Sequence, residues 1–334
     1  MNRSIKYTAI VAEETGNEIR PVVKTLDTTG LPPGDVFIRV LFSSLNYKDA
    51  LSATGNKGIT KKYPHTPGID ACGTVIVSNS SDFKEGDTVI VHGHDLGMNT
   101  SGGFGQYIKV PSDWVFLLPE GLSPAESMAL GTAGYTAALA IHQMELNGQD
   151  PSHGPVLVTG ATGGLASLAI NILKKKGYRV IASTGKKEES QYLHEIGATE
   201  IVSRAEVNDE SGKHLLRPRW AGAIDTVGGN ILVTALKACQ KHGNVVATGN
   251  ANSWEMHGTV FPFILNGVNL LGVDSATSGK ALRLKLWNHL ATGWKPEALP
   301  QISNIIPLES LPERIDLMLQ GKVRGRTVVD MNAE

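Results

Sequence analysis

A glycine-rich turn between an apolar strand and a helix constrains the fold of this sequence more than any other feature. The turn GATGGLA, residues 160–166, follows the apolar run Pro155–Thr159 and opens the predicted helix Gly164–Lys176. Glycines at this spacing let the backbone approach a pyrophosphate, whose charge the free N–H groups of the following helix receive. A glycine-rich stretch alone also fits an ordinary strand-to-helix turn. Because the strand Tyr178–Ser183 follows at βαβ spacing, the pattern predicts a dinucleotide site. Its expected residues are Thr162, Gly163, Gly164 and Leu165.

Apolar runs alternate with amphipathic segments on both sides of this turn. Further strands are predicted at Thr199–Val202, Ala221–Val227 and Asn244–Thr248, and helices at Ala125–Gln143, Glu188–Ile196 and Ile231–Lys241. Such alternation is typical of a parallel sheet covered by helices on both faces, so we predict a doubly wound α/β domain. The polar stretch Ala205–Pro218 is predicted to be a surface loop.

The first third of the chain has a different pattern, in which short β-branched runs are separated by Gly, Pro, Asn and Asp. Strands are predicted at Met1–Glu14, Asp35–Phe42, Gly73–Val77, Asp87–His92, Gln106–Val110 and Trp114–Leu118. This pattern indicates a compact β-barrel. A helix is predicted at Lys280–Ala291, and the final strand, Gly325–Met331, is expected to return to the barrel because the second sheet is already complete.

The end of the strand after the glycine-rich turn distinguishes between the two nicotinamide cofactors. In a dinucleotide fold this point faces the adenosine ribose, where an acidic residue binds the hydroxyls of NAD. The sequence instead has Ser183-Thr184-Gly185-Lys186-Lys187, whose hydroxyls and cations suit a 2′-phosphate. Thr184, Gly185 and Lys186 therefore predict NADPH as the cofactor. A second interpretation is that the two lysines are a solvated helix start.

Charge and cysteine content exclude several function classes. The 31 basic and 32 acidic residues nearly cancel, so nucleic acid is not an expected partner. Cys72 and Cys239 are the only cysteines and have no metal-ligand spacing, which argues against a disulfide framework or a zinc site and favours a reducing cytoplasm. No apolar run approaches the roughly 20 residues of a membrane helix, so no membrane partner is expected.

Segments along nearly the whole chain resemble one known family. They are SSLNYKDAL at 43–51, PHTPGIDACGTV at 64–75, FKEGDTV at 83–89, GGFGQY at 102–107 and GTAGYTA at 131–137. Together they resemble the medium-chain dehydrogenase/reductase family, which joins a GroES-like barrel to a Rossmann domain. AGAIDTVG at 221–228, LGVDS at 271–275 and GRT at 325–327 are similar to its quinone-oxidoreductase-like group, which contains the acrylyl-CoA reductases.

The resemblance implies an α/β fold with two domains. A GroES-like catalytic domain is expected at residues 1–126 and 270–334, and a Rossmann NADPH-binding domain at 127–269. Zinc members of the family have Gly-His-Glu where this chain has Gly68-Ile69-Asp70, and they also carry an early cysteine and a lobe of four cysteines. This chain lacks those residues, so we expect a zinc-independent enzyme.

The resemblance also implies specific site residues. Tyr47 is expected to face the nicotinamide and Asn46 to donate an amide hydrogen bond nearby, as catalytic residues. Asn46 and Asp49 also fit a loop anchor, an interpretation favoured for Asp49. Arg204 also fits an exposed arginine without a ligand, whereas Asp225 is interpreted as structural. The cofactor contacts implied are Tyr47, residues 162–165, residues 184–186, Arg204, Asn250, Ile264, Ser275 and Arg326.

The expected reaction is NADPH-dependent reduction of a short activated alkene, with acryloyl-CoA as the leading substrate. Reduction of quinones or of enones in general uses the same site and is the nearest alternative. A non-catalytic NADPH sensor or structural protein is the alternative from another class. A homodimer is expected through the exposed strand near Val268–Val273, which would pair across a two-fold axis.

Overall fold

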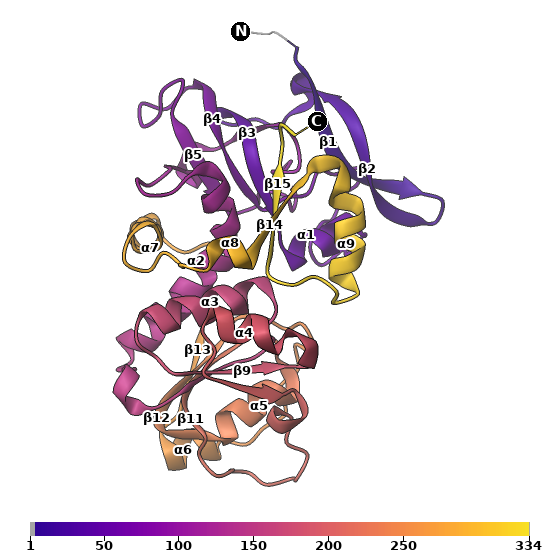
Figure 1. Cartoon of the computed structure of the whole chain (residues 1–334). Helices are drawn as coiled ribbons and strands as arrows, with labels where there is room; N and C mark the ends of the chain where they lie inside the picture. The colour runs from indigo at the N-terminus through magenta and orange to yellow at the C-terminus, as the bar shows by residue number, and fades with distance from the viewer. Residues whose placement is uncertain (1–3, 334) are drawn as a thin grey trace. The chain divides into compact units, whose positions relative to one another are not determined.

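The computed structural model describes residues 4–333 and divides into two compact units (Figure 1). Unit 1 comprises the chain up to Thr132, the segment Ala276–Ala291 and the chain from Ser303 onward. Unit 2 comprises Ala133–Ser275 and Thr292–Ile302. In the described part of the chain, no helix is long and apolar enough to cross a membrane.

Unit 2 is built on a parallel sheet with the strand order β10-β9-β8-β11-β12-β13 among the described residues. This is the doubly wound 3-2-1-4-5-6 order of a dinucleotide-binding domain, which confirms the predicted Rossmann fold. Figure 1 shows α3 and α4 on one face of the sheet and α5 and α6 on the other. The strands are β8 (Val156–Val158), β9 (Val180–Thr184), β10 (Glu200–Ser203), β11 (Trp220–Asp225), β12 (Cys239–Ala247) and β13 (Asn269–Gly272). The helices are α3 (Gly164–Lys175), α4 (Ser190–Ile196), α5 (Gly229–Lys237), α6 (Phe261–Asn266) and α8 (Leu299–Ile302).

Two sequence predictions about this unit need correction. The helix expected at Ile231–Lys241 ends at Lys237, and strand β12 already begins at Cys239, which pairs with Trp220 of β11. Pairing with the neighbouring strand therefore overrides the helical pattern of these residues. A register shift follows, because the next pair joins Gly222 to Asn244.

The second correction concerns the domain boundaries. Residues 270–275 and 292–302 were expected in the GroES-like domain but lie in unit 2, and residues 127–132 were expected in the Rossmann domain but lie in unit 1. The first segment completes β13, the sixth strand of the sheet described for this unit. The second packs on α3: Ala298 N–H donates to Asn171 Oδ1 at 3.2 Å, and Lys176 Nζ lies 3.9 Å from the centre of the Trp294 ring. Contacts with α3 that no local pattern reveals thus hold this segment.

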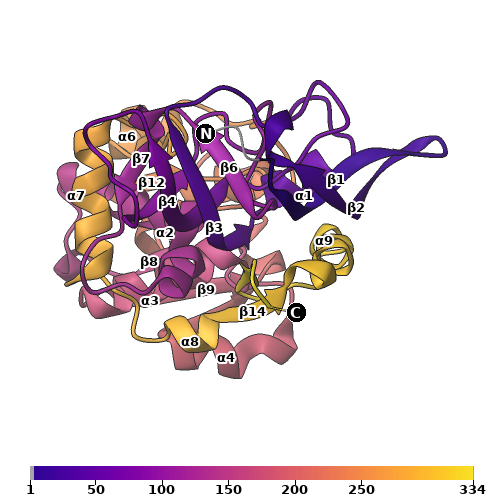
Figure 2. The ribbon, with the colours of Figure 1, turned by 90° about the horizontal axis from the view of Figure 1, so that it is seen from above.

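Unit 1 contains a sheet of seven described strands with the order β14-β15-β3-β4-β5-β7, in which β6 also pairs with β3, and a separate hairpin of β1 and β2. The final strand β15 pairs antiparallel with β3, so the predicted return of the chain end to the barrel is confirmed. The hairpin extends away from the larger sheet (Figure 1, Figure 2). The strands are β1 (Lys6–Thr15), β2 (Glu18–Asp27), β3 (Val36–Leu45), β4 (Asp70–Ser78), β5 (Thr88–His92), β6 (Tyr107–Val110), β7 (Val115–Leu117), β14 (Ser303–Pro307) and β15 (Arg326–Asp330).

Three helices of unit 1 complete its framework. Helix α1 (Tyr47–Ala53) directly follows β3, α7 (Lys280–Ala291) has the predicted bounds, and α9 (Leu311–Leu319) precedes β15. A fourth helix, α2 (Pro124–Leu146), begins in unit 1 and continues into unit 2. Its backbone departs from helical geometry at Gly131, where φ is 51° and ψ is −154°. The sequence did not predict α1, α9, β2 or β14.

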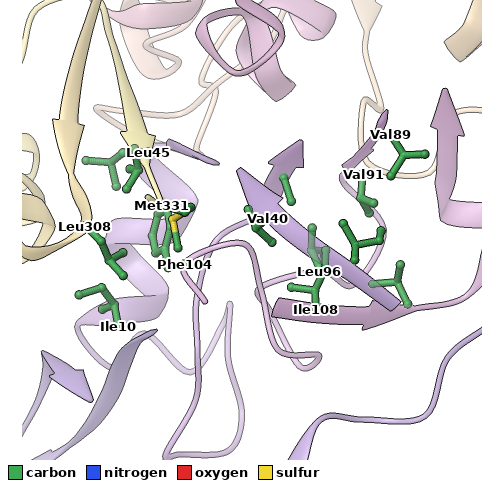
Figure 3. Packing of buried hydrophobic residues seen from close by; sticks show 14 of the residues in the cluster. Ile10, Val40, Leu45, Val89, Val91, Leu96, Phe104, Ile108, Leu308 and Met331 are labelled. Atoms are coloured by element: carbon green, nitrogen blue, oxygen red, sulfur yellow. The ribbon is translucent and has the colours of Figure 1, made fainter. Parts of the chain in front are cut away.

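One apolar core joins segments that lie far apart in the sequence of unit 1. Figure 3 shows Ile10 of β1, Leu45 of β3, Phe104, Leu308 and Met331 within one cluster. Leu45 and Phe104 are fully buried. Each fully buried leucine or phenylalanine contributes about 1.5–3 kcal/mol relative to an exposed one. This core fixes where β3 ends and α1 begins.

Candidate functional site

The glycine-rich turn in unit 2 has a geometry that requires glycine at its first position. Gly160 has a φ of 60°, and a Cβ there would lie 2.4 Å from Thr226 Oγ1. The Thr226 hydroxyl is itself held, because it donates to the Thr159 carbonyl at 2.9 Å. At Gly163 a Cβ would meet only the Gly160 carbonyl oxygen, at 3.2 Å. The space at the start of α3 is therefore open on the side where a ligand would approach.

A cavity in unit 2 lies at the carboxyl ends of β8, β9, β10 and β11. In a doubly wound sheet this is the topological switch point, where ligands bind. The cavity brings together five of the predicted cofactor residues: Thr162, Thr184, Gly185, Lys186 and Arg204. The other lining residues are Thr159, Gly160, Ser183, Val227 and Ile231.

Two cations and no carboxylate line this cavity, as far as the described residues show. Lys186 follows a turn in which its N–H donates to Thr184 Oγ1 at 3.0 Å. Arg204 lies across the backbone of Gly185, since a Cβ on Gly185 would be 3.2 Å from the guanidinium carbon. Glycine at 185 thus leaves room for the planar guanidinium. The pair suits an anionic group, because a guanidinium can bond two phosphate oxygens and an ammonium adds a point charge.

The nearby Asp225 carboxylate serves the fold, as the sequence analysis proposed. It accepts hydrogen bonds from Thr159 Oγ1 and from the Gly228 N–H, each at 2.7 Å. Burial raises the pKa of Asp225. These bonds tie the end of β11 to the end of β8, next to the cavity.

The remaining predicted cofactor residues of unit 2 do not line this cavity. Gly163, Gly164 and Leu165 continue from Thr162 into α3. Asn250 lies beside Gly228, since a Cβ on Gly228 would be 3.3 Å from the Asn250 Cα. Ile264 is on α6 with 67% of its surface exposed, and Ser275 follows β13. Their cofactor contacts stay predictions.

In unit 1, Asn46 and Asp49 form the start of α1. The Asp49 carboxylate accepts from the Asn46 N–H at 2.8 Å and from the Ile69 N–H at 2.8 Å. Burial, and then the charge of Asp70, raise the pKa of Asp49 to about 7, although the N–H donors of Asn46 and Ile69 oppose that shift. The arrangement matches the loop-anchor interpretation of Asp49.

The Asn46 amide is engaged by neighbours in unit 1. Its nitrogen donates to Asp70 Oδ2 at 2.8 Å and to Asp49 Oδ2 at 3.1 Å, and its oxygen accepts from Arg326 at 3.0 Å. An amide nitrogen has two hydrogens, and both are used. The arrangement therefore favours an anchoring role for Asn46 over the predicted hydrogen bond to a substrate.

Arg326 is likewise committed to unit 1. It is only 3% exposed, and its guanidinium donates to Ser44 Oγ at 2.8 Å, to Asn46 Oδ1 and to the carbonyls of Leu45, Ala129 and Met128. An arginine has five N–H donors, so this set uses them all. The geometry favours a structural role for Arg326 over the predicted cofactor contact.

Tyr47 differs from these neighbours because it is open to solvent. It is the first residue of α1 and 46% exposed. Among residues 4–333, no hydrogen-bond partner of its hydroxyl is found within unit 1. A fixed backbone with an available hydroxyl is what a substrate-orienting residue needs.

Asp70 is a central residue of unit 1 for which the sequence predicted no structural role. It is fully buried and accepts from Ser44 Oγ at 2.6 Å and from the Thr132 N–H at 3.0 Å, and it lies 3.8 Å from the Arg326 guanidinium. The only available signal was the placement of Ser44 and Asp70 in otherwise apolar strands. Such a placement predicts a buried polar network but not its partners.

Comparisons with known proteins agree with this architecture. Residues 32–120 match the model of the alcohol dehydrogenase GroES-like domain, and residues 164–286 match the model of the zinc-binding dehydrogenase. In the described residues, no group of three or more His, Cys, Asp and Glu side chains is arranged to hold a metal ion.

Three full-length relatives are informative. The chain is 42% identical to acrylyl-CoA reductase AcuI of Ruegeria pomeroyi, covering 98% of this chain and 100% of that protein. It is 42% identical, with the same coverage, to YhfP of Bacillus subtilis, whose name marks it as a candidate quinone oxidoreductase. The YhfP structure with NAD bound has a TM-score of 0.94 over 98% of this chain and 99% of its own. The YhdH oxidoreductase of Salmonella enterica, in complex with NADP, also has a TM-score of 0.94, with 40% identity over 97% of this chain and 100% of its own.

We expect Gly131→Ala to destabilise unit 1 by about 2–4 kcal/mol. A Cβ at Gly131 would lie 2.5 Å from Asp70 Oδ2 and 2.8 Å from Ser44 Oγ, and the residue also has a positive φ. Urea unfolding measures the loss. Gly86→Ala is the control, because Gly86 has a φ of 89° but nothing within 4 Å of its Cβ position. It should cost only about 1 kcal/mol of backbone strain. Equal losses in the two variants would contradict the steric argument.

Proposed function

Because this chain belongs to the medium-chain dehydrogenase/reductase family, in its quinone-oxidoreductase-like group, we propose that it reduces the carbon–carbon double bond of a short activated alkene with NADPH. The chain is an oxidoreductase, and acryloyl-CoA is the substrate proposed for it. The observation that carries this proposal is the 42% identity over 98% of the chain to an acrylyl-CoA reductase.

The cavity of unit 2 supports NADPH as the cofactor. Its cationic pair, Lys186 and Arg204, fits a 2′-phosphate, and the open start of α3 fits a pyrophosphate. The relative that carries NADP in its structure supports this cofactor, whereas YhfP was solved with NAD. Because Lys186 and Arg204 line this cavity, NADPH is proposed rather than NADH.

The proposed chemistry needs little from the protein beyond positioning. NADPH supplies the hydride when it is bound. The β-carbon of an enoyl thioester receives that hydride, the α-carbon receives a proton, and the double bond becomes a single bond while the cofactor is oxidised. Tyr47 is proposed to orient the thioester with its free hydroxyl and to stabilise the negative charge that collects on the thioester oxygen. Asn46 fixes the backbone from which Tyr47 projects.

We propose that no metal takes part in this reaction. Zinc members use Gly-His-Glu where this chain has Gly68-Ile69-Asp70. Here the Asp70 carboxylate is fully buried and is committed to Ser44, Asn46 and Thr132. A chelator-treated protein should therefore keep its full activity.

Turnover with NADPH tests the proposed function. Acryloyl-CoA should be reduced with a higher kcat/KM than any member of a panel of quinones and simple enones, before and after chelator treatment. A higher kcat/KM with quinones would establish the second candidate, which the similarity to YhfP favours. Binding of NADPH without turnover of any acceptor would establish a non-catalytic NADPH-binding protein instead.

Lys186→Glu should reverse much of the preference for NADPH over NADH, because a carboxylate in the cavity repels the 2′-phosphate. We expect the ratio of kcat/KM with NADPH to kcat/KM with NADH to fall by about 100-fold. The loss of the lysine's attraction and the added repulsion by the carboxylate, at about 1.4 kcal/mol each, together give that factor. Lys187→Glu is the control, because Lys187 is the adjacent, exposed residue and does not line the cavity. Equal catalytic efficiency with both cofactors in the unmutated protein would overturn the assignment.

Tyr47→Phe should lower kcat by ~100-fold if the hydroxyl donates the proton, with little change in NADPH affinity. If the hydroxyl only orients the thioester, we expect a smaller loss and no change in the solvent isotope effect. Tyr107→Phe is the matched control, a half-buried tyrosine of β6 that stacks on Phe37. If both Tyr47→Phe and Tyr47→Ala have kcat and KM values close to those of the unmutated protein, Tyr47 has no catalytic role.

We also propose that the protein is a homodimer that pairs through β13. This strand is the edge of the sheet of unit 2, and the adjacent α6 exposes Ile264 and Leu265 by 67% and 56%. An open strand edge beside apolar side chains is suited to pairing with a second copy. Sedimentation velocity should show a dimer, and Leu265→Glu should weaken it. A monomer at micromolar concentrations of the unmutated protein would contradict this proposal.

A further inference from the structure

The segment that follows α1 in unit 1 concentrates positive charge. Residues 46–68 contain four lysines and a single acidic residue, Asp49, which is buried. Lys57, Lys61 and Lys62, here called the lysine segment, are all exposed. No carboxylate of the described residues lies within ion-pair distance of their ammonium groups, whereas Lys24 and Lys175 are paired. Charge is therefore available on this segment for an outside anion.

The lysine segment is held against α1 by specific bonds. Tyr63 donates its hydroxyl to the Ser52 carbonyl at 2.8 Å, and the hydroxyls of Ser52 and Thr60 lie 2.7 Å apart. Lys57 Nζ lies 4.5 Å from the centre of the Tyr63 ring and 3.5 Å from the Lys61 carbonyl oxygen. The backbone that carries the three lysines is thus fixed relative to the helix that begins at Tyr47.

The neighbouring hairpin of β1 and β2 does not neutralise this charge. It lies beside the segment, since the backbones of Ala12 and His65 exchange two hydrogen bonds. Three carboxylates of the hairpin are already paired within it: Glu13 with Lys24, Glu18 with Arg20 and Asp27 with Lys6. Glu14 is also exposed there, but one carboxylate opposes three ammonium groups. The local charge stays positive.

We propose that Lys57, Lys61 and Lys62 bind the pyrophosphate and 3′-phosphate groups of a CoA thioester. This inference rests on the proposed function and names the part of the protein that would distinguish a CoA thioester from a quinone. Lysine ammonium groups bind phosphate as point charges. A quinone has no phosphate, so a lysine segment that no carboxylate neutralises favours an anionic substrate over a quinone.

The dimensions of α1 fit this assignment. CoA carries its phosphates at one end and the acyl group at the other, joined by a long flexible pantetheine arm. Helix α1 has seven residues, which at ~1.5 Å per residue span about 10 Å. A flexible arm can span this length, so one molecule can place its acyl group at Tyr47 and its phosphates at the lysine segment.

The test compares two thioesters on the triple variant K57Q/K61Q/K62Q at saturating NADPH. The KM for acryloyl-CoA should rise roughly tenfold, as expected for the loss of several exposed ion pairs, with kcat nearly unchanged. The KM for acryloyl-N-acetylcysteamine, which lacks all phosphates, should not move. Added salt should raise the KM for acryloyl-CoA in the unmutated protein and much less in the variant.

The control is K84Q/K109Q/K285Q, which removes the same charge from lysines of unit 1 outside the segment. It should leave the KM for acryloyl-CoA as it is. An unchanged KM in the K57Q/K61Q/K62Q variant, or an equal rise in both triple variants, would overturn the inference.

A direct binding measurement separates this inference from the proposed function. If the unmutated protein reduces neither thioester, the proposed function fails, but calorimetry with CoA alone still tests the lysine segment. The protein is first saturated with NADP, so that the adenosine part of CoA cannot bind in the dinucleotide cavity. Unmutated protein should bind CoA about tenfold more tightly than the K57Q/K61Q/K62Q variant. Equal affinity, or no binding by either protein, would overturn the inference.

Discussion

The buried ion pair between Asp70 and Arg326 determines how unit 1 closes. The two residues lie 3.8 Å apart and are 0% and 3% exposed, and the hydrogen bonds of Arg326 reach the carboxyl end of β3 and the first part of α2. Removing one partner of such a pair typically costs about 3–5 kcal/mol, because the other charge stays buried. The pair thereby favours the position of β15, the last strand, beside β3. Both partners also bond the Asn46 side chain, which holds this residue at the start of α1.

Local patterns were sufficient to predict most of unit 2 and the return of the last strand to unit 1, but not the side-chain contacts that hold these segments in place. Strand β8, the turn at 160–166 and helix α3 are consecutive, so their order and their apolar periodicity appear in a short stretch of sequence. Strand β12 is different, because its early start at Cys239 depends on a partner strand. The segment 292–302 depends on Asn171 and Lys176, more than a hundred residues earlier. No periodicity in the segment itself can reveal such partners.

The predicted site residues also differ in whether a local pattern is enough to predict their role. Thr162, Thr184 and Lys186 follow directly from the glycine-rich turn and the end of the next strand, and one cavity contains them. For Asn46 and Arg326, the family resemblance implied contacts with a ligand. Only the hydrogen-bond geometry shows that their donors are already used by Asp70, Ser44 and backbone carbonyls. A polar residue near a site is available to a ligand only if its donors are not already satisfied.

When a cofactor supplies the reactive hydride, the shape and charge of the substrate site determine which substrate the protein accepts, and no reactive side chain is needed. This explains why a resemblance within this group predicts the cofactor more securely than the acceptor. The residues that recognise the dinucleotide follow the turn and the strand ends, which the fold itself dictates. The residues proposed to recognise the acceptor lie on a connecting segment, 54–63, and such segments are free to vary within a fold. Charge on such a segment that no carboxylate neutralises is therefore the more informative guide to the proposed substrate, even though the Lys57 ammonium also lies over the Tyr63 ring.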